Sequence, residues 1–198
     1  MLSSRKILDW WKAPVCITQI VAYPFVKFVS AIIVRSHLDV SRRFKLKKGA
    51  SYVIYSNHQS KIDPFLILAS LPFETCIKLL PFRLFVNNAF FSNYFNVLFL
   101  RIFGGFPAHH NDKRPYGLDY ARILLASGQT VVIFPQGTRT REKIVKSGIA
   151  VLAKEPNVYL IPIYLDWKNR LTCYVKIGQP FKALNSQADQ LIDHLYKI

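Results

Sequence analysis

The segment that decides the fold is SYVIYSNHQSKIDP, residues 51–64. Its first part, residues 51–56, is a short run of β-branched and aromatic side chains, which predicts a strand. Residues 62–71 are predicted to form a helix, with Asp63 as its N-cap and Pro64 at its first helical position. The segment is therefore expected to pass from a strand, through a short polar loop, into a helix.

The rest of the chain continues this alternation of strands and helices. We expect extended segments at 76–80, 103–108, 130–134, 158–165 and 171–177, and helices at about 81–100, 116–126, 147–154 and 187–196. Such alternation predicts an α/β fold with a mixed, mainly parallel sheet flanked by helices. Ligands of such sheets bind in the loops beyond the carboxyl ends of the strands, so functional residues are expected there.

Composition narrows the class of protein. The chain has 198 residues, of which 51% are hydrophobic and 14% aromatic, and its 27 Lys and Arg against 11 Asp and Glu give a net charge of +16. A chain so rich in apolar and aromatic residues is not disordered, and its length suffices for one domain with a core. With 8 Gly and 3 Cys it is neither collagen-like nor disulfide-stapled. A basic and apolar chain suits an anionic membrane surface, or an anionic substrate held there.

An apolar run at residues 17–34 is expected to form a helix. Its polar positions are spaced by three or four residues and form one narrow stripe: Gln19, Tyr23, Lys27 and Ser30. Such a helix can lie in the membrane interface, with Trp10 and Trp11 as headgroup-level anchors. The alternatives are a buried core helix and a single span, although the run is near the lower length limit for a span and contains Pro24.

This interpretation divides the chain into two parts. Residues 1–36 are predicted to be an N-terminal interfacial helical segment, and residues 37–198 an α/β domain. A second apolar region, residues 79–106, contains many Phe residues but also Asn residues and Arg101, which argue against a span. This region is interpreted as core, as a lipid-contacting face or as a groove for an acyl chain.

The loop after the first strand contains a possible catalytic pair. Four residues separate His58 from Asp63. A carboxylate that accepts a hydrogen bond from one imidazole nitrogen fixes the tautomer and leaves the other nitrogen as a base. The alternatives are that Asp63 only caps its helix and that His58 is an ordinary loop residue. A nucleophilic Ser56 or Ser60 is a further alternative.

A second loop, FPQGTRTR at residues 134–141, also follows a predicted strand. Gly137 permits positive φ and a close approach of the backbone to a ligand. Thr138 offers a hydroxyl and Arg139 a planar guanidinium for phosphate oxygens, and Lys146 follows. The loop is therefore a candidate phosphate site, and the alternative is a solvated basic loop.

The two loops together resemble the glycerol-3-phosphate and lysophosphatidate acyltransferase family. The resemblance rests on N-H-Q-S-x-x-D at residues 57–63 and F-P-x-G-T-R at residues 134–139, with weaker matches at 104–111 and 161–163. The short chain resembles the 1-acylglycerol-3-phosphate branch, whose bacterial members bind membranes through N-terminal helices. This branch transfers a fatty acyl group from acyl carrier protein or coenzyme A to the 2-hydroxyl of lysophosphatidate and yields phosphatidate for phospholipid biosynthesis.

The resemblance also implies roles for individual residues. His58 and Asp63 would be catalytic, and the residues that bind substrate would be Gln136, Gly137, Thr138, Arg139, His110 and Lys146. No cofactor is implied, because the acyl thioester is a substrate. No metal site is expected, since the adjacent His109 and His110 would point to opposite faces of a strand. The expected location is the cytoplasmic face of a membrane, as a monotopic protein or with a single N-terminal anchor.

Two positions depart from the family pattern. Gln136 stands where the family usually has Glu, which keeps an acceptor oxygen and removes a negative charge. His110 stands where the family usually has Arg. The phosphate grip is therefore expected to depend more on Arg139, with help from Lys146 or Arg114.

Two other functions remain open on the sequence alone. One is acyl transfer to a different lyso-lipid. The other is a non-enzymatic basic module that binds anionic lipid or nucleic acid, which the charge of +16 would permit. The sequence has no helix-turn-helix, RNP-like or zinc pattern, and no nucleic-acid partner is expected.

Overall fold

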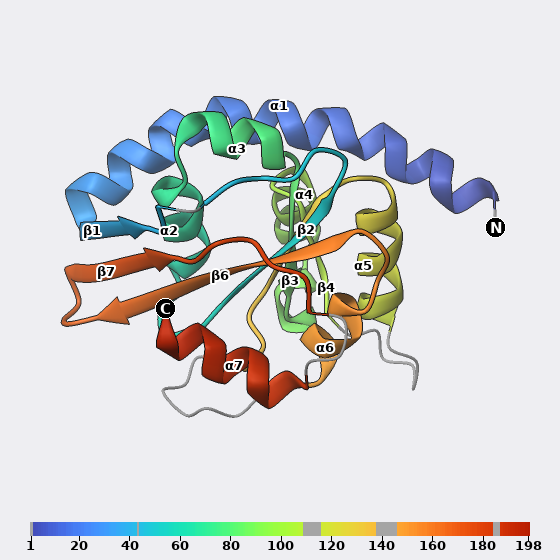
Figure 1. Cartoon of the computed structure of the whole chain (residues 1–198). Coiled ribbons are helices and arrows are strands. Elements are labelled where there is room, and N and C mark those ends of the chain that lie inside the picture. The colour runs from blue at the N-terminus through green and yellow to red at the C-terminus, as the bar shows by residue number, and fades with distance from the viewer. Residues whose placement is uncertain (1, 43, 109–115, 138–145, 184–186) are drawn as a thin grey trace.

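The computed structural model describes residues 2–42, 44–108, 116–137, 146–183 and 187–198, with the backbone alone for residues 2–11 and 116. Figure 1 shows the arrangement of its elements. In chain order they are α1 (Leu2–Ile33), β1 (Arg35–Val40), β2 (Ser51–Ser56), α2 (Asp63–Ser70), α3 (Phe73–Leu79), β3 (Phe82–Val86), the 3-10 helix η1 (Asn88–Phe91), α4 (Tyr94–Ile102), β4 (Gly105–Pro107), α5 (Tyr116–Ala126), β5 (Thr130–Ile133), α6 (Gly148–Ala153), β6 (Val158–Trp167), β7 (Thr172–Ile177) and α7 (Ala188–Lys197).

The strands form one seven-stranded sheet in the order β1-β7-β6-β2-β5-β3-β4. The strands β6, β2, β5, β3 and β4 are mutually parallel, β7 is antiparallel to β6, and β1 is parallel to β7. This confirms the predicted mixed, mainly parallel sheet flanked by helices. The strand predicted at residues 51–56 is β2 in the middle of the sheet, where helices cover both faces and nearly every side chain is buried.

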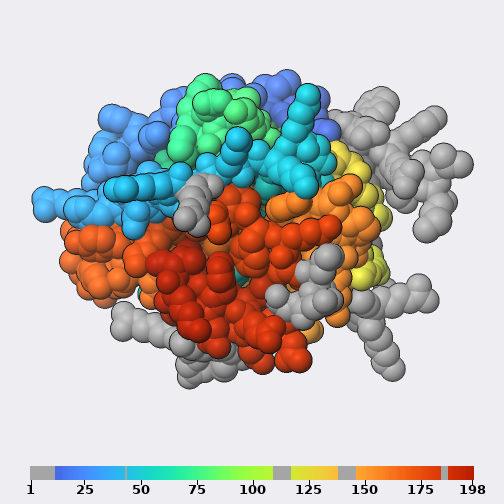
Figure 2. Space-filling model, viewed as in Figure 1, coloured from blue at the N-terminus to red at the C-terminus, as the bar shows by residue number. Residues whose placement is uncertain are grey.

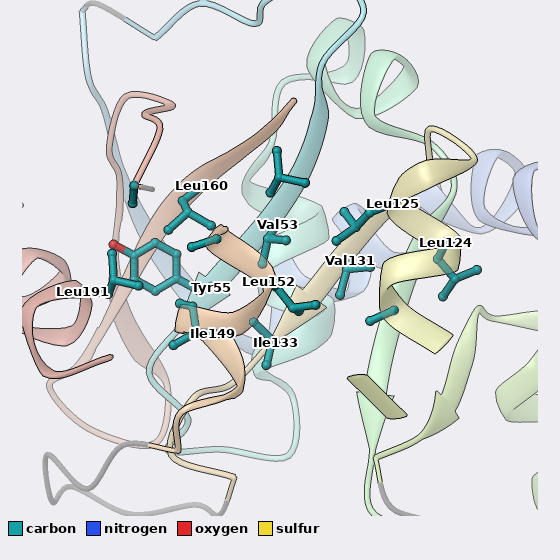
Figure 3. Packing of buried hydrophobic residues seen from close by; sticks show 14 of the residues in the cluster. Val53, Tyr55, Leu124, Leu125, Val131, Ile133, Ile149, Leu152, Leu160 and Leu191 are labelled. Carbon is teal, nitrogen blue, oxygen red and sulfur yellow. The ribbon is translucent and has the colours of Figure 1, made fainter. Parts of the chain in front are cut away.

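Two hydrophobic clusters lie on the two faces of the sheet. On one face, Val53 and Tyr55 of β2 pack against α5, α6 and α7, as the close view in Figure 3 shows. On the other face, Tyr52 and Ile54 pack against α2, α3 and the inner side of α1. In Figures 1 and 2, α1 and α3 therefore border one side of the molecule and α7 the opposite side.

The predictions between residues 76 and 100 were wrong in type. The strand expected at residues 76–80 is the end of helix α3, which buries Cys76 and Leu79 one turn apart and ends before Pro81. The helix expected at about 81–100 is divided into β3, η1 and α4. Asn87 and Asn93 begin η1 and α4, because their side chains accept hydrogen bonds from Ala89 N and Asn96 N.

The edge strand β1 was not predicted at all. Its sequence, RSHLDV, is exposed at five of its six positions, so it lacks the apolar pattern of a buried strand. By contrast, the helix predicted at residues 116–126 is α5 and ends as expected. Gln129 N donates to Leu124 O and Gly128 N to Leu125 O, with Gly128 at a φ of 74°, which is a Schellman motif.

The helix α1 extends the apolar run predicted at 17–34, and two residues of its polar stripe face inward. Gln19 and Tyr23 are buried. The Gln19 amide donates to Phe82 O at 2.8 Å and accepts from Phe82 N at 2.9 Å, and the Tyr23 hydroxyl donates to Leu71 O at 2.8 Å. The large apolar side chains instead point outward: Ile17, Ile20, Val21, Phe25, Phe28, Ile32 and Ile33. The segment Lys12–Ile33 is long and apolar enough to cross a membrane. The side chains of Trp10 and Trp11 lie outside the described part of the structure.

Candidate active site

The carboxyl ends of β2, β5 and β6 lie side by side at one edge of the sheet, because these three strands are parallel neighbours. The loop after β2 contains His58, the loop after β5 contains Gln136 and Gly137, and β6 ends at Trp167. This is the edge at which open α/β sheets bind ligands. The topology therefore brings together side chains that lie far apart in the sequence.

The centre of the site is a hydrogen-bonded histidine and aspartate. His58 Nδ1 lies 2.9 Å from Asp63 Oδ2, and the side chains are 20% and 0% exposed. Among the described residues, none forms a hydrogen bond with His58 Nε2. The imidazole stacks on the ring of Phe134 with 4.2 Å between the centroids. The ring is thus held on one face and at one nitrogen, and within the described part of the chain its other nitrogen has no partner.

Asp63 does not cap its helix in the predicted way. The N-cap of α2 is Ile62, and Asp63 is the first residue of the helix. Its Oδ2 accepts from the backbone N–H groups of Gln59 and Ser60, each at 2.7 Å, so the carboxylate organises the loop that precedes the helix. This loop carries His58, and the same carboxylate oxygen therefore fixes both the histidine and its backbone.

The other oxygen of Asp63 accepts a hydrogen bond from a residue that the sequence did not indicate. Trp167 Nε1 donates to Asp63 Oδ1 at 2.9 Å from the end of β6. Asp63 thus accepts four hydrogen bonds, from His58, from two backbone amides and from an indole. Trp167 could have been suspected only from its position at the carboxyl end of a predicted strand.

Two side-chain amides tie the histidine loop to neighbouring strands. Asn57 donates to Leu165 O at 2.7 Å and accepts from Leu165 N at 2.8 Å. Gln136 Oε1 accepts from His58 N at 2.8 Å, and Gln136 is 2% exposed. Gln136 also forms a hydrogen bond with Tyr196 of α7. Burial raises the pKa of the Tyr196 phenol, and this hydrogen bond offsets part of that rise. An acceptor oxygen is therefore used at position 136, as Gln or Glu would both provide.

Two buried side chains, Ser56 and Cys173, are poorly placed to act as nucleophiles. Ser56 is fully buried, and its hydroxyl donates to Asn57 O at 3.1 Å. Cys173 is also buried, and burial, followed by the nearby charge of Asp63, raises the pKa of its thiol to about 12. A thiol with such a pKa is protonated at neutral pH and is a weak nucleophile.

The second loop places a cation beside a glycine. Gly137 has a φ of 69°, and a Cβ added there would lie 2.6 Å from Lys146 Nζ. Any side chain at position 137 would therefore displace the lysine. Lys146 N donates to Pro135 O at 2.9 Å, which closes the base of the loop. The loop thus presents an exposed ammonium group on the side of the site that follows β5.

Part of the predicted site lies outside the described residues. These predictions concern Thr138, Arg139 and His110, and also Arg114 as the alternative to Lys146. The structure brings together the other five: His58, Asp63, Gln136, Gly137 and Lys146. Within the described residues there is no cluster of three or more His, Cys, Asp or Glu that could hold a metal ion, and since His109 and His110 are not described, the expectation of no metal stays a prediction.

Three comparisons relate the chain to known proteins. A family model described as Acyltransferase matches residues 37–166, from β1 to the end of β6, and so includes His58, Asp63 and Gln136. A relative, the 1-acyl-sn-glycerol-3-phosphate acyltransferase of Bacillus subtilis (strain 168), is 25% identical over 130 residues, which are 65% of this chain and 62% of that protein. The chain therefore spans less than two thirds of the length of this relative.

A solved structure resembles nearly the whole chain. It is the crystal structure of the 1-acyl-sn-glycerophosphate (LPA) acyltransferase PlsC from Thermotoga maritima, with a TM-score of 0.59 and 18% sequence identity. The similarity covers 98% of this chain and 95% of that chain. The likeness extends to the N-terminal part of the chain, which the family model does not cover, and it shows a shared fold.

Proposed function

Because the chain belongs to the acyltransferase family, we propose that it transfers a fatty acyl group from an acyl thioester to the 2-hydroxyl of 1-acylglycerol-3-phosphate. The product is phosphatidate, a precursor in phospholipid biosynthesis. The observation that carries the proposal is the His58–Asp63 pair, in which one imidazole nitrogen is bound to a buried carboxylate and the other has no partner among the described residues. The resemblance of the whole chain to a lysophosphatidate acyltransferase supports the same acceptor.

In the proposed mechanism His58 acts as general base. Nε2 takes the proton of the acceptor hydroxyl as its oxygen attacks the thioester carbonyl. The new C–O ester bond forms as the C–S bond breaks, and the imidazolium returns the proton to the leaving thiolate. Asp63 holds the Nδ1–H tautomer and stabilises the imidazolium. General-base assistance of this kind contributes about 10²–10⁴ in rate.

The loop after β5 is proposed to hold the acceptor phosphate. Lys146 lies against Gly137, so an ammonium group is already at this loop. Thr138, Arg139 and His110 are proposed to add hydrogen-bond donors to the phosphate. Gln136, which the family resemblance would place among the substrate ligands, is proposed to act by holding the backbone of His58, since its amide is buried.

The acyl donor is proposed to be acyl carrier protein or a coenzyme A thioester, and no cofactor is needed for the transfer. Membrane association is proposed through α1, on the cytoplasmic side where acyl thioesters are present. Gln19 and Tyr23 fix α1 along the surface of the domain, which supports a helix lying in the interface over one that crosses the bilayer.

The deciding experiment uses purified full chain, a labelled acyl donor and a panel of lyso-lipid acceptors, with products identified by mass. We expect phosphatidate from 1-acylglycerol-3-phosphate, and loss of product in His58→Ala. The matched control is His37→Ala, because His37 is an exposed histidine on the edge strand β1, three strands away from β2. Full turnover by His58→Ala would overturn the mechanism, and a preferred acceptor without phosphate would overturn the assigned substrate.

A second variant tests the position of the carboxylate. Trp167→Phe keeps an aromatic ring and removes the hydrogen bond to Asp63 Oδ1. We expect kcat to fall by about tenfold, the value of one hydrogen bond to a charged group, while KM for the acceptor changes little. An unchanged kcat would show that Trp167 has only a packing role.

A further inference from the structure

The segment η1–α4 is an apolar surface that the acyl-transfer chemistry does not explain. No residue of η1 or α4 is buried. Five of its large hydrophobic side chains are exposed by 38–81%: Phe90, Tyr94, Phe95, Leu98 and Phe99. Helices in water usually bury one face, and an exposed group of this kind marks a contact with another molecule. The segment is too exposed to serve as a groove that encloses an acyl chain.

One end of this surface lies against α1. The Gln19 side chain donates to Phe103 O, at the C-cap of α4, at 3.0 Å, so the end of α4 lies against the middle of α1. Ile17 and Val21 of α1, two residues to either side of the buried Gln19, point away from this contact and are 62% and 70% exposed. The two helices therefore present exposed apolar side chains on adjoining parts of the molecule.

The charged residues within α1 and within η1–α4 are almost all basic. Of the 11 acidic residues in the chain, only Asp9 lies within α1, and none lies between Lys78 and Asn111, which includes η1 and α4. Basic residues are present in both parts, with Lys27 exposed on α1 and Arg101 exposed near the end of α4. An apolar surface bordered by cations and almost free of carboxylates matches an anionic phospholipid bilayer.

We propose that η1–α4 is a second membrane-contact segment, which inserts its aromatic side chains into the interface of an anionic phospholipid bilayer beside α1. The inference rests on the proposed function in that the acceptor and product are membrane lipids. η1 follows the carboxyl end of β3, the same edge of the sheet from which His58 emerges. Since α4 runs from η1 back toward the start of β3, it is the η1 end of the contact that lies at this edge, and an acceptor can reach the site from the bilayer there.

The first test measures partitioning of the full chain onto vesicles of phosphatidylcholine and phosphatidylglycerol. Phe95 is 81% exposed, so Phe95→Ser removes apolar contact with little effect on the fold. We expect the partition coefficient to fall by about tenfold, with residual binding through α1. The matched control is Ile123→Ser on α5, which is 37% exposed outside this surface and should bind as the wild type does. Equal binding by Phe95→Ser and the wild type would overturn the proposal.

The second test locates the segment directly. Phe95→Trp places an indole on α4, and the wild-type spectrum is subtracted because the chain already has three Trp. We expect the added emission to shift to shorter wavelength on vesicles and to be quenched by brominated lipids. Unquenched emission on vesicles that retain the protein would show that α4 faces water. A lipid-free dimer that Phe95→Ser dissociates would instead assign the surface to a second copy of the chain.

The two proposals fail in different assays. Acyl transfer to a short-chain, water-soluble lysophosphatidate does not require a bilayer, so Phe95→Ser is expected to keep the wild-type kcat in that assay. No transfer by the wild type would overturn the proposed function and leave the vesicle result unaffected. Normal transfer together with wild-type vesicle binding by Phe95→Ser would overturn the membrane contact alone.

Discussion

The helices α1 and α7 cover opposite faces of the same sheet with opposite polarity. α7 turns apolar side chains such as Leu191 and Leu195 into the core and leaves polar residues outside. α1 turns Gln19 and Tyr23 inward, while its Phe25 side chain remains 68% exposed. Figure 1 shows both helices running along the borders of the molecule, α1 at the top and α7 at the bottom.

The difference lies in how each helix is held. α7 is held against the sheet by burial of its apolar side chains, and this contact is fully formed in water. Hydrogen bonds from Gln19 and Tyr23 to backbone groups of the domain contribute strongly to holding α1, and they leave most of its apolar surface unused in folding. The outer side of α7 is therefore suited to water, and the outer side of α1 to an apolar environment. Substitutions on α7 should change stability in water, whereas substitutions on the outer side of α1 should change binding to membranes.

The largest effect on folding is expected from α7. Leu195 is fully buried, and Leu195→Ala should lower the free energy of unfolding by about 2–5 kcal/mol, through lost burial and a cavity. Urea denaturation in the absence of lipid measures this change. A loss below about 1 kcal/mol would mean that α7 contributes little to the core and would break the comparison.

A smaller effect is expected from the inner side of α1. Gln19→Leu leaves the N–H and C=O groups of Phe82 without their side-chain partner, which should cost about 1–3 kcal/mol of stability. The same denaturation assay measures it. If Gln19→Leu were stabilising, as for a helix attached by apolar contact, the contrast between the two helices would be wrong.

The outer side of α1 should contribute almost nothing to stability in water. Phe28 is 64% exposed, so Phe28→Ser is expected to change the free energy of unfolding by less than about 0.5 kcal/mol. Its binding to anionic vesicles should fall. A marked loss of stability together with unchanged vesicle binding would show that this face packs within the protein.

The smallest effect is the contribution of His194, on α7, to the pH dependence of stability. Burial, followed by the charge of Lys197, lowers the pKa of His194, which lies 3.3 Å from the Tyr55 hydroxyl. The unfolded chain therefore binds a proton at this position first as the pH falls below about 6.5, and stability decreases. His194→Gln removes this contribution, so its urea midpoint should fall less than that of the wild type between pH 7.5 and 5.5. Equal decreases in the urea midpoint for His194→Gln and the wild type would contradict a lowered pKa at His194.

Local patterns predicted the elements whose own side chains determine them. The buried strands β2 and β5 and the Gly128-terminated helix α5 were predicted close to their observed bounds. The short apolar run around Cys76 was assigned to the wrong type, because four or five apolar residues fit a strand and a helix turn equally well. The edge strand β1 has no pattern of its own and exists because β7 lies beside it.

The candidate site was predictable only where its partners are close in the sequence. The spacing of His58 and Asp63 indicated their pairing, since both belong to one loop. Trp167 lies 104 residues from Asp63, and Leu165 lies 108 residues from Asn57, so only the order of the strands brings them together. The inward orientation of Gln19 likewise depends on a backbone group 63 residues away.

The four hydrogen bonds to Asp63 have a consequence for mutational tolerance. A neutral Asn would turn a donor toward one of these four donors, and a smaller residue would leave buried N–H groups unpaired. Loop architecture and chemistry thus demand the same carboxylate. In a saturation-mutagenesis screen this position would be among the least permissive, and the screen alone would not distinguish a residue needed for turnover from one needed for shape.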